Sequence, residues 1–414
     1  MREMKDCGIA WVQEIPLSWN IMPNKYLMFK LKNVCPVYNG EDILSLTMKG
    51  VIVRDLDAGG KMPSSFDGYQ RISAGNLLMC LFDIDVTPRC VGLVKQNGLT
   101  SPAYSQFVLR ENANAAFYCY YYTMLDMDKT LLHLAKNLRH SLTEDQLGAI
   151  PAIVPPLDEQ QRIADFLDDK CAKIDALTAD IQSQIDTLEQ YKRSVITEAV
   201  TKGLNPGATM KDSGVKWIGT MPSLWNCIRG KYILTYVQKP IREDDGVVTC
   251  FRDGEVTLRT NRREDGFTMA DKEIGYQGID VGDLVVHGMD GFAGAIGISD
   301  SRGKASPVLN VLDTKQNKRY IMYYLRSMAY GDVFVAMATG IRVRSCDLRW
   351  NKLSELLYPV PSLQEQQEIV EYIDSMIDKA NAVIADKQGQ LATLDEYKKS
   401  LIYEYVTGKK EVTA

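Results

Sequence analysis

The stretch KDCGIAWVQEIPLSWN (residues 5–20) recurs as KDSGVKWIGTMPSLWN (residues 211–226), at an offset of 206 residues. The same offset holds much later in the chain, where it relates Pro155 to Pro361 and Tyr191 to Tyr397. Similarity at a fixed interval indicates a duplicated fold, so we expect two similar halves with a pseudo-two-fold arrangement. The middle of each half matches poorly, which predicts two similar surfaces that recognise different things.

The composition is that of an ordinary globular chain. Of 414 residues, 45% are hydrophobic and 24% are charged, which predicts two to four domains. No run approaches the ~20 apolar residues of a membrane helix, and the first ten residues lack the apolar core of a secretory signal. The nine cysteines form no C-x-x-C pair. We therefore expect a cytoplasmic protein with reduced thiols and no metal site.

The charge is unevenly distributed along the chain, whose net charge is −5. Residues 1–150 carry 15 basic and 15 acidic side chains, and residues 205–358 carry 21 basic and 18 acidic side chains. Residues 151–204 and residues 359–414 each carry 6 basic and 10 acidic side chains. The poorly matching segments are thus neutral to basic. A local basic face is sufficient for phosphate binding, so the net charge does not argue against a nucleic-acid ligand.

Residues 159–202 are predicted to form one long helix. The stretch contains no Pro or Gly, Asp158 is a suitable N-cap, and Gly203 is a suitable C-cap. Apolar residues recur in steps of three and four, and one seam repeats every seven residues: Ile174, Ile181, Leu188 and Val195. Such a seam is typical of a coiled coil.

A second long helix is predicted for residues 365–407, ending at Gly408. Gly389 interrupts it, at a cost of about 1 kcal/mol relative to Ala. The offset places these apolar residues on the equivalent face: Ile369, Ile373, Ile377, Val383, Leu391, Leu394, Tyr397 and Leu401. Because each helix has one apolar stripe, we expect the two to pack together, antiparallel. Ordinary bundle helices are the alternative.

The remaining segments predict compact mixed domains. Strand-like runs occur at residues 77–82 and 284–287, and helical runs at residues 113–135 and 318–336. The expected fold is therefore α+β, with two mixed α/β domains in a pseudo-two-fold repeat joined by two long antiparallel coiled-coil helices. The expected boundaries are residues 1–150, 151–205, 206–358 and 359–414.

Catalytic motifs were sought and not found. The sequence has no GxxxxGK[ST], HExxH or GxSxG pattern, and its three histidines are not paired at ligand spacing. Gly291, Gly294 and Gly297 form a GxxGxxG run, which we interpret as a turn between two strands rather than a dinucleotide or adenosylmethionine loop. No Asn/Asp-Pro-Pro-aromatic tetrapeptide of amino-methyltransferases occurs. We therefore expect a chain without catalytic residues, metal or cofactor.

The two Trp-x4-Pro-x2-Trp openings, quoted above, resemble the start of target-recognition domains in specificity (S) subunits of type I restriction–modification enzymes. "IVPPLDEQQRIADFLDDKCAKIDALTADIQSQIDTLEQYKRSVITEAVTKGL" resembles the central helical region of that family, and "PVPSLQEQQEIVEYIDSMIDKANAVIADKQGQLATLDEYKKSLIYEYVTGK" resembles the distal one. "GDLVVHGMDGFAGAIGISD" is similar to part of a second recognition domain. The resemblance covers essentially the whole chain.

This resemblance implies a function and a set of partners. Each variable domain would read one half of a split double-stranded DNA target, and the paired helices would set the spacer between the halves. The helices would also dock two methyltransferase (modification) subunits, which restriction/translocase subunits join. S-adenosylmethionine, ATP and Mg²⁺ would be bound by those partner subunits and not by this chain.

Basic and amide side chains of the variable segments are the candidate DNA contacts, because Arg and Lys bind phosphates and guanine and Asn binds adenine. In the first segment the candidates are Arg54, Lys61, Arg71, Arg89 and Lys95. In the second they are Arg252, Arg259, Asn261, Arg262, Arg263, Arg342 and Arg344. A solvated surface charge is the alternative for each.

The repeated L-x-E-Q-Q-x-I at the start of each long helix is the candidate methyltransferase-docking site. Its residues are Leu157, Gln160, Gln161, Ile163, Leu363, Gln366, Gln367 and Ile369. Helix capping and core packing would explain the same residues equally well. For the chain as a whole, the alternatives to a specificity subunit are a methyltransferase or fused restriction enzyme, a stand-alone bipartite DNA-binding protein, and a coiled-coil adaptor.

Overall fold

The computed structural model describes residues 2–58, 63–87, 89–135, 140–262, 273–337 and 348–412. The chain forms two compact units. The first comprises Met1–Ile181 with Gln388–Ala414, and the second comprises Gln182–Lys387. Each long helix therefore contributes one half to each unit, rather than forming a segment of its own. Below, residues 2–156 are the first globular domain and residues 203–362 the second.

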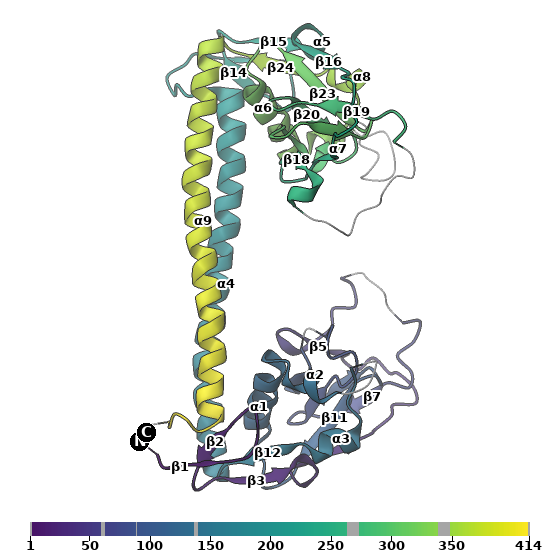
Figure 1. Cartoon of the computed structure of the whole chain (residues 1–414), viewed down its shortest axis with the longest axis vertical. Helices are drawn as coiled ribbons and strands as arrows, with labels where there is room; N and C mark the ends of the chain where they lie inside the picture. Colours follow the sequence, from purple (N-terminus) through teal and green to yellow (C-terminus); the bar gives the residue numbers. More distant parts are fainter. Residues whose placement is uncertain are drawn as a thin grey trace. The chain divides into compact units, whose positions relative to one another are not determined.

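The first globular domain is built on a four-stranded antiparallel sheet (Figure 1). Its strand order is β4 (Met28–Leu31), β11 (Ser105–Leu109), β8 (Leu77–Met79) and β9 (Val91–Leu93). Four antiparallel strand pairs surround it: β1 (Met4–Asp6) with β2 (Glu14–Pro16), β3 (Asn20–Pro23) with β12 (Pro151–Val154), β5 (Leu44–Thr47) with β6 (Gly50–Val53), and β7 (Gln70–Ile72) with β10 (Gly98–Thr100). The helices are η1 (Asn24–Tyr26), α1 (Ala115–Met127), α2 (Thr130–Leu134) and α3 (Glu144–Ala149).

The second globular domain repeats this plan strand for strand. Its four-stranded sheet has the order β16 (Leu234–Val237), β23 (Leu309–Thr314), β20 (Leu284–His287) and β21 (Ile296–Ile298). The surrounding pairs are β13 (Met210–Asp212) with β14 (Thr220–Pro222), β15 (Asn226–Arg229) with β24 (Leu357–Val360), β17 (Val248–Cys250) with β18 (Val256–Leu258), and β19 (Gln277–Ile279) with β22 (Gly303–Ala305). The helices are α5 (Gly230–Ile233), η2 (Arg259–Asn261), η3 (Gly291–Ala293), α6 (Lys318–Tyr330), α7 (Val333–Ala336) and α8 (Trp350–Leu353). The duplication thus extends through the segments whose sequences match poorly.

Equivalent aromatic residues form the two cores. Trp19 and Trp225 are buried almost completely in the first and second domain, respectively. The indole of Trp11 donates to the hydroxyl of Tyr121 on α1, and the indole of Trp217 donates to that of Tyr324 on α6. Each repeated Trp-x4-Pro-x2-Trp motif therefore joins the opening strands of its domain to the helix that covers the sheet.

The predicted long helices are α4 (Leu157–Lys202) and α9 (Leu363–Val406). In the first unit the ring of Phe166 lies 4.4 Å from that of Tyr405, and Lys398 donates to Asp175 at 2.5 Å. In the second unit Lys387 donates to Gln184, and Lys192 donates to Asn381 at 2.8 Å. Within each unit, the residue number of the contacting residue on α9 falls as the residue number on α4 rises. The helices therefore pair antiparallel in each unit, as predicted (Figure 1).

Several details of the sequence-based expectations were wrong. Asp158 is not an N-cap: α4 begins at Leu157, and Asp158 pairs with Arg162 inside the first turn. The helix predicted for residues 113–135 breaks at Lys129, and that for residues 318–336 breaks at Asp332, because both residues adopt a left-handed backbone. The strand predicted for residues 77–82 ends at Met79. Val383 and Tyr397, predicted on the apolar face of the second long helix, are 45% and 53% exposed, and their repeats on the first, Leu177 and Tyr191, are each 47% exposed.

Two predictions about glycines are confirmed. The GxxGxxG run forms the turn η3 between β20 and β21, with Gly294 at φ 98°. Gly203 and Gly408 follow the long helices with φ of 70° and 73°. Gly408 is additionally constrained by packing, because a Cβ atom there would lie 2.6 Å from Pro16 and 2.8 Å from the Trp19 ring.

Among the described helices, none is both long enough and apolar enough to cross a membrane.

We expect Gly408→Ala to destabilise the first unit by about 2 kcal/mol or more, because the new side chain needs a left-handed backbone and meets Trp19. The matched control is Gly389→Ala within α9, where a Cβ atom would have no neighbour within 4 Å. That substitution should stabilise the protein by up to about 1 kcal/mol. Thermal and denaturant unfolding of the full chain measure both. Equal effects of the two substitutions would contradict this account of Gly408.

Candidate nucleic-acid interface

Glu159, in the first turn of α4, binds two side chains from the start of the chain. The indole Nε1 of Trp19 donates to Glu159 Oε2 at 2.9 Å, and Arg2 Nη1 donates to Glu159 Oε1 at 2.6 Å. The hydrogen bond that Arg2 donates to Glu159 raises the pKa of the Arg2 guanidinium. Trp19 and Glu159 are both buried, so this pair fixes the opening strands of the first domain to the helix.

Gln160 and Gln161 bind a segment of the domain much later in the sequence than Trp19, at the N-cap of α1. The side-chain oxygen of Gln160 accepts from the backbone N–H of Asn114 at 2.8 Å, and its amide donates to the carbonyls of Asn112 and Pro155. Asn114 caps α1 through Oδ1 and donates through Nδ2 to Gln161 at 2.7 Å. Gln160 is completely buried and Gln161 is exposed.

The second unit repeats these contacts. Trp225 Nε1 donates to Glu365 Oε2 at 3.0 Å. Gln366 accepts from the backbone N–H of Asn317, the N-cap of α6, at 2.9 Å, and Asn317 Nδ2 donates to Gln367 at 2.8 Å. We call Glu159, Gln160 and Gln161, with Glu365, Gln366 and Gln367, the helix-start clamps. Each clamp joins a long helix to the globular domain of its own unit.

The clamps correct the docking prediction. Gln160, Ile163, Gln366 and Ile369 are buried inside their own unit and present no surface to another protein. Gln161 and Gln367 are exposed but each is bound to an N-cap asparagine. Of the predicted docking residues, Leu157 and Leu363 are the well-exposed apolar ones, at 50% and 58%. Capping and packing, the alternative considered from the sequence, explain most of the motif.

We expect Gln160→Leu to lower the free energy of unfolding by roughly 2–4 kcal/mol, because it leaves the backbone groups of Asn114, Asn112 and Pro155 buried without a partner. Gln161→Ala, one residue on but exposed, should cost less than about 1 kcal/mol. The corresponding pair in the second unit is Gln366→Leu and Gln367→Ala. Denaturant unfolding checks all four. If the exposed glutamine mattered as much as the buried one, burial would not be the reason for the effect.

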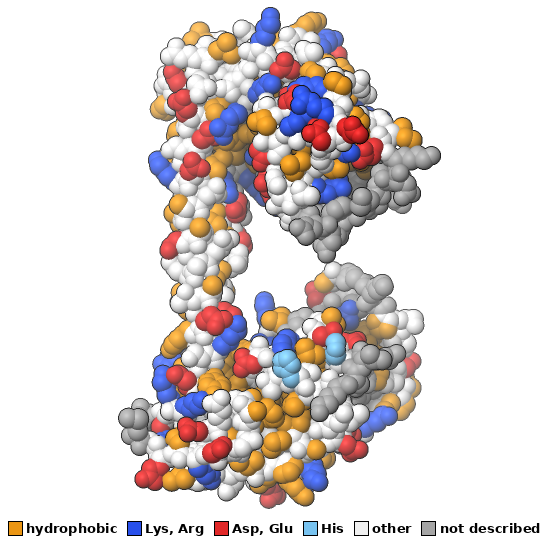
Figure 2. Space-filling model, viewed as in Figure 1, with side chains coloured by type: hydrophobic (Ala, Val, Ile, Leu, Met, Phe, Trp, Pro, Cys, Tyr) orange, Lys and Arg blue, Asp and Glu red, His pale blue; other side chains and the backbone are white. Residues whose placement is uncertain are grey.

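In the second domain, most described candidate DNA contacts are already paired with carboxylates or hydroxyls. Arg262 binds Asp253 at 2.7 Å and Glu255 at 3.2 Å, and its guanidinium lies 4.3 Å from the centre of the Phe251 ring. Arg252 binds Asp290 at 2.9 Å. Figure 2 shows acidic side chains among the basic ones on this domain. DNA would therefore have to compete with internal carboxylates for these arginines.

The neighbouring candidates, Arg259 and Asn261, lie in η2, directly after β18. Arg259 Nε donates to Thr249 at 3.3 Å, and Asn261 Nδ2 donates to Thr257 at 2.8 Å. Both contacts hold the η2 turn against the β17–β18 hairpin. Four predicted contacts lie outside the described residues: Lys61, Arg263, Arg342 and Arg344.

The first-domain candidates divide into two groups. Arg71, on β7, is bound to Glu41 at 2.9 Å and to the Cys35 sulfur at 3.0 Å, and Arg54, after β6, is partly buried. Arg89 and Lys95, at the two ends of β9, both line one groove of about 360 Å³. Lys49, in the β5–β6 turn, lines the same groove. Sequence reasoning missed Lys49, although its place in a Lys-Gly turn was a usable signal.

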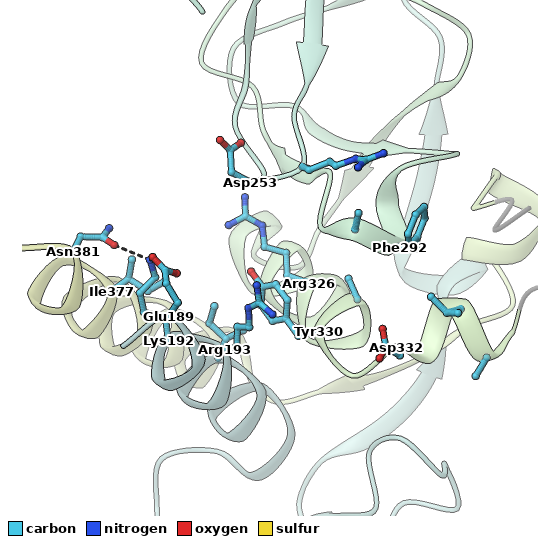
Figure 3. A pocket seen from close by; sticks show the side chains of 16 residues that line it. Glu189, Lys192, Arg193, Asp253, Phe292, Arg326, Tyr330, Asp332, Ile377 and Asn381 are labelled. Carbon is cyan, nitrogen blue, oxygen red and sulfur yellow. Dashed lines mark hydrogen bonds and ion pairs between the residues drawn. The ribbon is translucent and has the colours of Figure 1, made fainter. Parts of the chain in front are cut away.

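The second unit has a groove at the equivalent position, with a volume of about 1050 Å³ (Figure 3). In Figure 3, Lys192 and Arg193 of α4 and Asn381 of α9 form one wall, and Arg326 and Tyr330 of α6 face them. The offset of 206 relates helix positions in the two grooves: Lys192 to Lys398, Ile196 to Ile402, Cys171 to Ile377 and Asp175 to Asn381. Each unit thus has a groove between its globular domain and the helix pair.

Burial shifts the pKa values of two described groups that are suited to acid–base or thiol chemistry. Burial lowers the pKa of His287, whose Nδ1 accepts from the backbone N–H groups of Met289 and Asp290. Burial raises the pKa of the Cys119 thiol to about 11, which keeps it protonated at neutral pH. Among the described residues, no cluster of three or more His, Cys, Asp or Glu is placed to hold a metal ion.

Residues 91–187 match the family model described as the type I restriction modification DNA specificity domain. This stretch is therefore similar to a type I restriction–modification DNA specificity domain. The matched residues run from β9 through α1 and α3 into α4, and so include the first helix-start clamp. The resemblance recognised in the sequence is confirmed over these residues.

Solved structures resemble this chain, and the first of them shares its fold. One, from work on complex assembly and conformational transition of the type I R-M system, has a TM-score of 0.68 at 14% identity, covering 96% of this chain and 99% of the other. The HsdS subunit from Thermoanaerobacter tengcongensis is 15% identical, with a TM-score of 0.49 over 96% of this chain and 98% of the other. The type I S subunit from M. genitalium is 11% identical, with a TM-score of 0.37, covering 94% of this chain and 96% of the other. No curated protein matches the sequence.

Proposed function

We propose that this chain is the DNA-recognition subunit of a type I restriction–modification complex, in which each globular domain reads one half of a split target. The duplication carries this proposal: both units have the same strand plan, while their candidate contact residues differ in type and pairing. Two unlike readers on one duplicated scaffold suit a target with two unlike halves. The match to a DNA specificity domain supports DNA as the ligand.

The proposal includes a division of labour between subunits. This chain contributes recognition and no catalytic residues. Two methyltransferase subunits would bind S-adenosylmethionine, and restriction/translocase subunits would bind ATP and Mg²⁺. The complex would act in the cytoplasm. Burial favours the neutral forms of the Cys119 thiol and the His287 imidazole, two described groups otherwise suited to nucleophilic or acid–base chemistry.

The first experiment is a methylated-adenine map of cells that carry this gene with a methyltransferase partner, compared with cells that lack only this gene. A split sequence motif that disappears with the gene is the expected result, and it would give both half-sites and the spacer. An unchanged methylation map, with the protein expressed and folded, would count against the proposed function.

The paired helices are proposed to set the spacer. Four residues inserted after Ile181 and four more after Lys387, where both helices pass from one unit to the other, would lengthen each by about 6 Å. At about 3.4 Å per base pair, we expect the spacer to grow by about two base pairs while both half-sites stay unchanged. The same methylation map measures this. Altered half-sites with the original spacer would contradict the ruler role.

The methyltransferase subunits are proposed to dock on the helix pair, on the side away from the grooves. Leu177 and Tyr397 are exposed apolar residues on α4 and α9 in the first unit, and their repeats in the second are Val383 and Tyr191. Asp175, two residues from Leu177, faces the groove, so Leu177 lies about 200° further round the helix. We call these residues the outer apolar pairs. Two equivalent pairs suit two copies of one partner.

We expect Leu177→Asp with Tyr397→Asp to remove one of two methyltransferase subunits, and Val383→Asp with Tyr191→Asp to remove the other. A charge on an exposed apolar contact disfavours burial there without disturbing a core. Native mass measurement of the assembled complex gives the stoichiometry. Each pair of substitutions serves as the control for the other. The variant that carries all four substitutions should bind neither methyltransferase subunit. Retention of both copies by every variant would place the docking surface elsewhere.

A further inference from the structure

The grooves of the two units carry different electrostatics despite their equivalent positions. Four basic side chains line the first-unit groove: Lys49, Arg89, Lys95 and Lys398. Lys398 is bound to Asp175 at 2.5 Å, and the other acidic residue of the groove, Asp168, accepts from Tyr120 at 2.7 Å. Among the described residues, no carboxylate pairs with Lys49, Arg89 or Lys95. Within the part of the chain that the structure describes, these three therefore leave a local positive charge without a paired carboxylate.

The second-unit groove also has four basic residues, but they are neutralised or structurally engaged. Arg252 is bound to Asp290 at 2.9 Å and Lys192 to Glu189 at 2.9 Å. Arg326 donates to the backbone carbonyls of Ile296 and Gly254 at 2.7 and 2.8 Å. Arg193 lies over the ring of Tyr330, 5.3 Å from its centre, as Figure 3 shows. Glu189, Asp253 and Asp332 add acidic groups to the same lining.

We infer that the first-unit groove binds phosphate groups of the DNA backbone through Lys49, Arg89 and Lys95, and that the second-unit groove does not. The inference rests on the proposed function and extends it, because it makes the two half-sites unequal. These contacts would add affinity and orientation without reading bases. The affinity for DNA at the first half-site would therefore depend more strongly on salt than that at the second.

The positions of the three residues favour a polynucleotide over a compact anion. Lys49 lies in the β5–β6 turn, whereas Arg89 and Lys95 lie before and after β9, so the charges are spread along the groove rather than converging on one point. A free nucleotide or pyrophosphate offers the same phosphate chemistry. The spread of the charges suits a row of phosphates, and Lys95 lies within the residues that match the DNA specificity domain.

The test uses the full chain with its methyltransferase subunits and a duplex that contains the mapped target. Binding is measured as a function of salt for the wild type and for Lys49→Ala with Lys95→Ala. Loss of two phosphate contacts should reduce the slope of log K against log salt by about 2, and should weaken binding to target and mutated duplexes alike. The methylated motif should stay unchanged. Lys49→Arg with Lys95→Arg keeps the charge and should restore the slope.

Arg252→Ala is the matched control in the second-unit groove. Because its guanidinium is already bound to Asp290, its removal should leave the slope unchanged. All substituted side chains are exposed, so the thermal midpoint should not move. A slope unaffected by the lysine substitutions would overturn the inference, and an equal reduction from Arg252→Ala would overturn the asymmetry.

Inorganic pyrophosphate, followed by calorimetry, separates the two sources of phosphate. If the lysine substitutions abolished pyrophosphate binding and left the DNA slope intact, the groove would be a small-anion site and the DNA inference would be wrong. If the lysine substitutions abolished methyltransferase binding and left the slope intact, the groove would be a protein-docking surface, and the DNA inference would again be wrong. If the wild-type complex recognised no DNA motif at all, the proposed function would fail, whereas a recognised motif with unchanged slopes would reject only the groove inference.

Discussion

Two helices of more than forty residues, each with a single apolar stripe, are stable in water only when the stripes are covered, and the structure depends on this constraint. In each unit α4 and α9 cover one another antiparallel, with contacts such as Phe166 on Tyr405 and Lys398 on Asp175 in the first unit. Because the helices run in opposite directions, the start of one helix lies beside the end of the other within each unit. Each globular domain consequently packs against both helices, and the first core includes residues from α4 and from the end of α9.

The helix-start clamps show how a short motif can orient a whole domain. Glu159 binds the indole of Trp19, and Gln160 binds the backbone at Asn114, so one helical turn contacts the domain at two places far apart in the sequence. Both contacts are buried, where an unpaired polar group costs about 1–3 kcal/mol. A domain held at two such points has little freedom to rotate on its helix. That rigidity is a requirement for any scaffold that measures a distance along DNA.

Duplication with divergent charge explains how one scaffold can present two unlike surfaces. The strand plan is the same in both units, yet Arg262 and Arg252 are bound by carboxylates, whereas Arg89 and Lys95 are not paired with a carboxylate among the described residues. Strand pairing is carried by the backbone and tolerates such differences at the surface. The surfaces could therefore diverge without changing the framework, and the framework keeps the two readers in equivalent positions within their units.

The sequence by itself determined the duplication, the two long helices to within two residues at their starts, the glycine C-caps, the η3 turn and the family resemblance. These features are local or periodic: heptad spacing, a missing Pro or Gly, and a repeated Trp motif are visible without knowing which segments meet. Only the tertiary structure decided what the L-x-E-Q-Q-x-I motif does, since Glu159 acquires its role from Trp19, 140 positions earlier. The same holds for the exposed Leu177 and Tyr397 and for the pairing of each arginine. Burial and charge neutralisation are properties of neighbours brought together by folding, and the spacing of residues along one chain does not specify those neighbours.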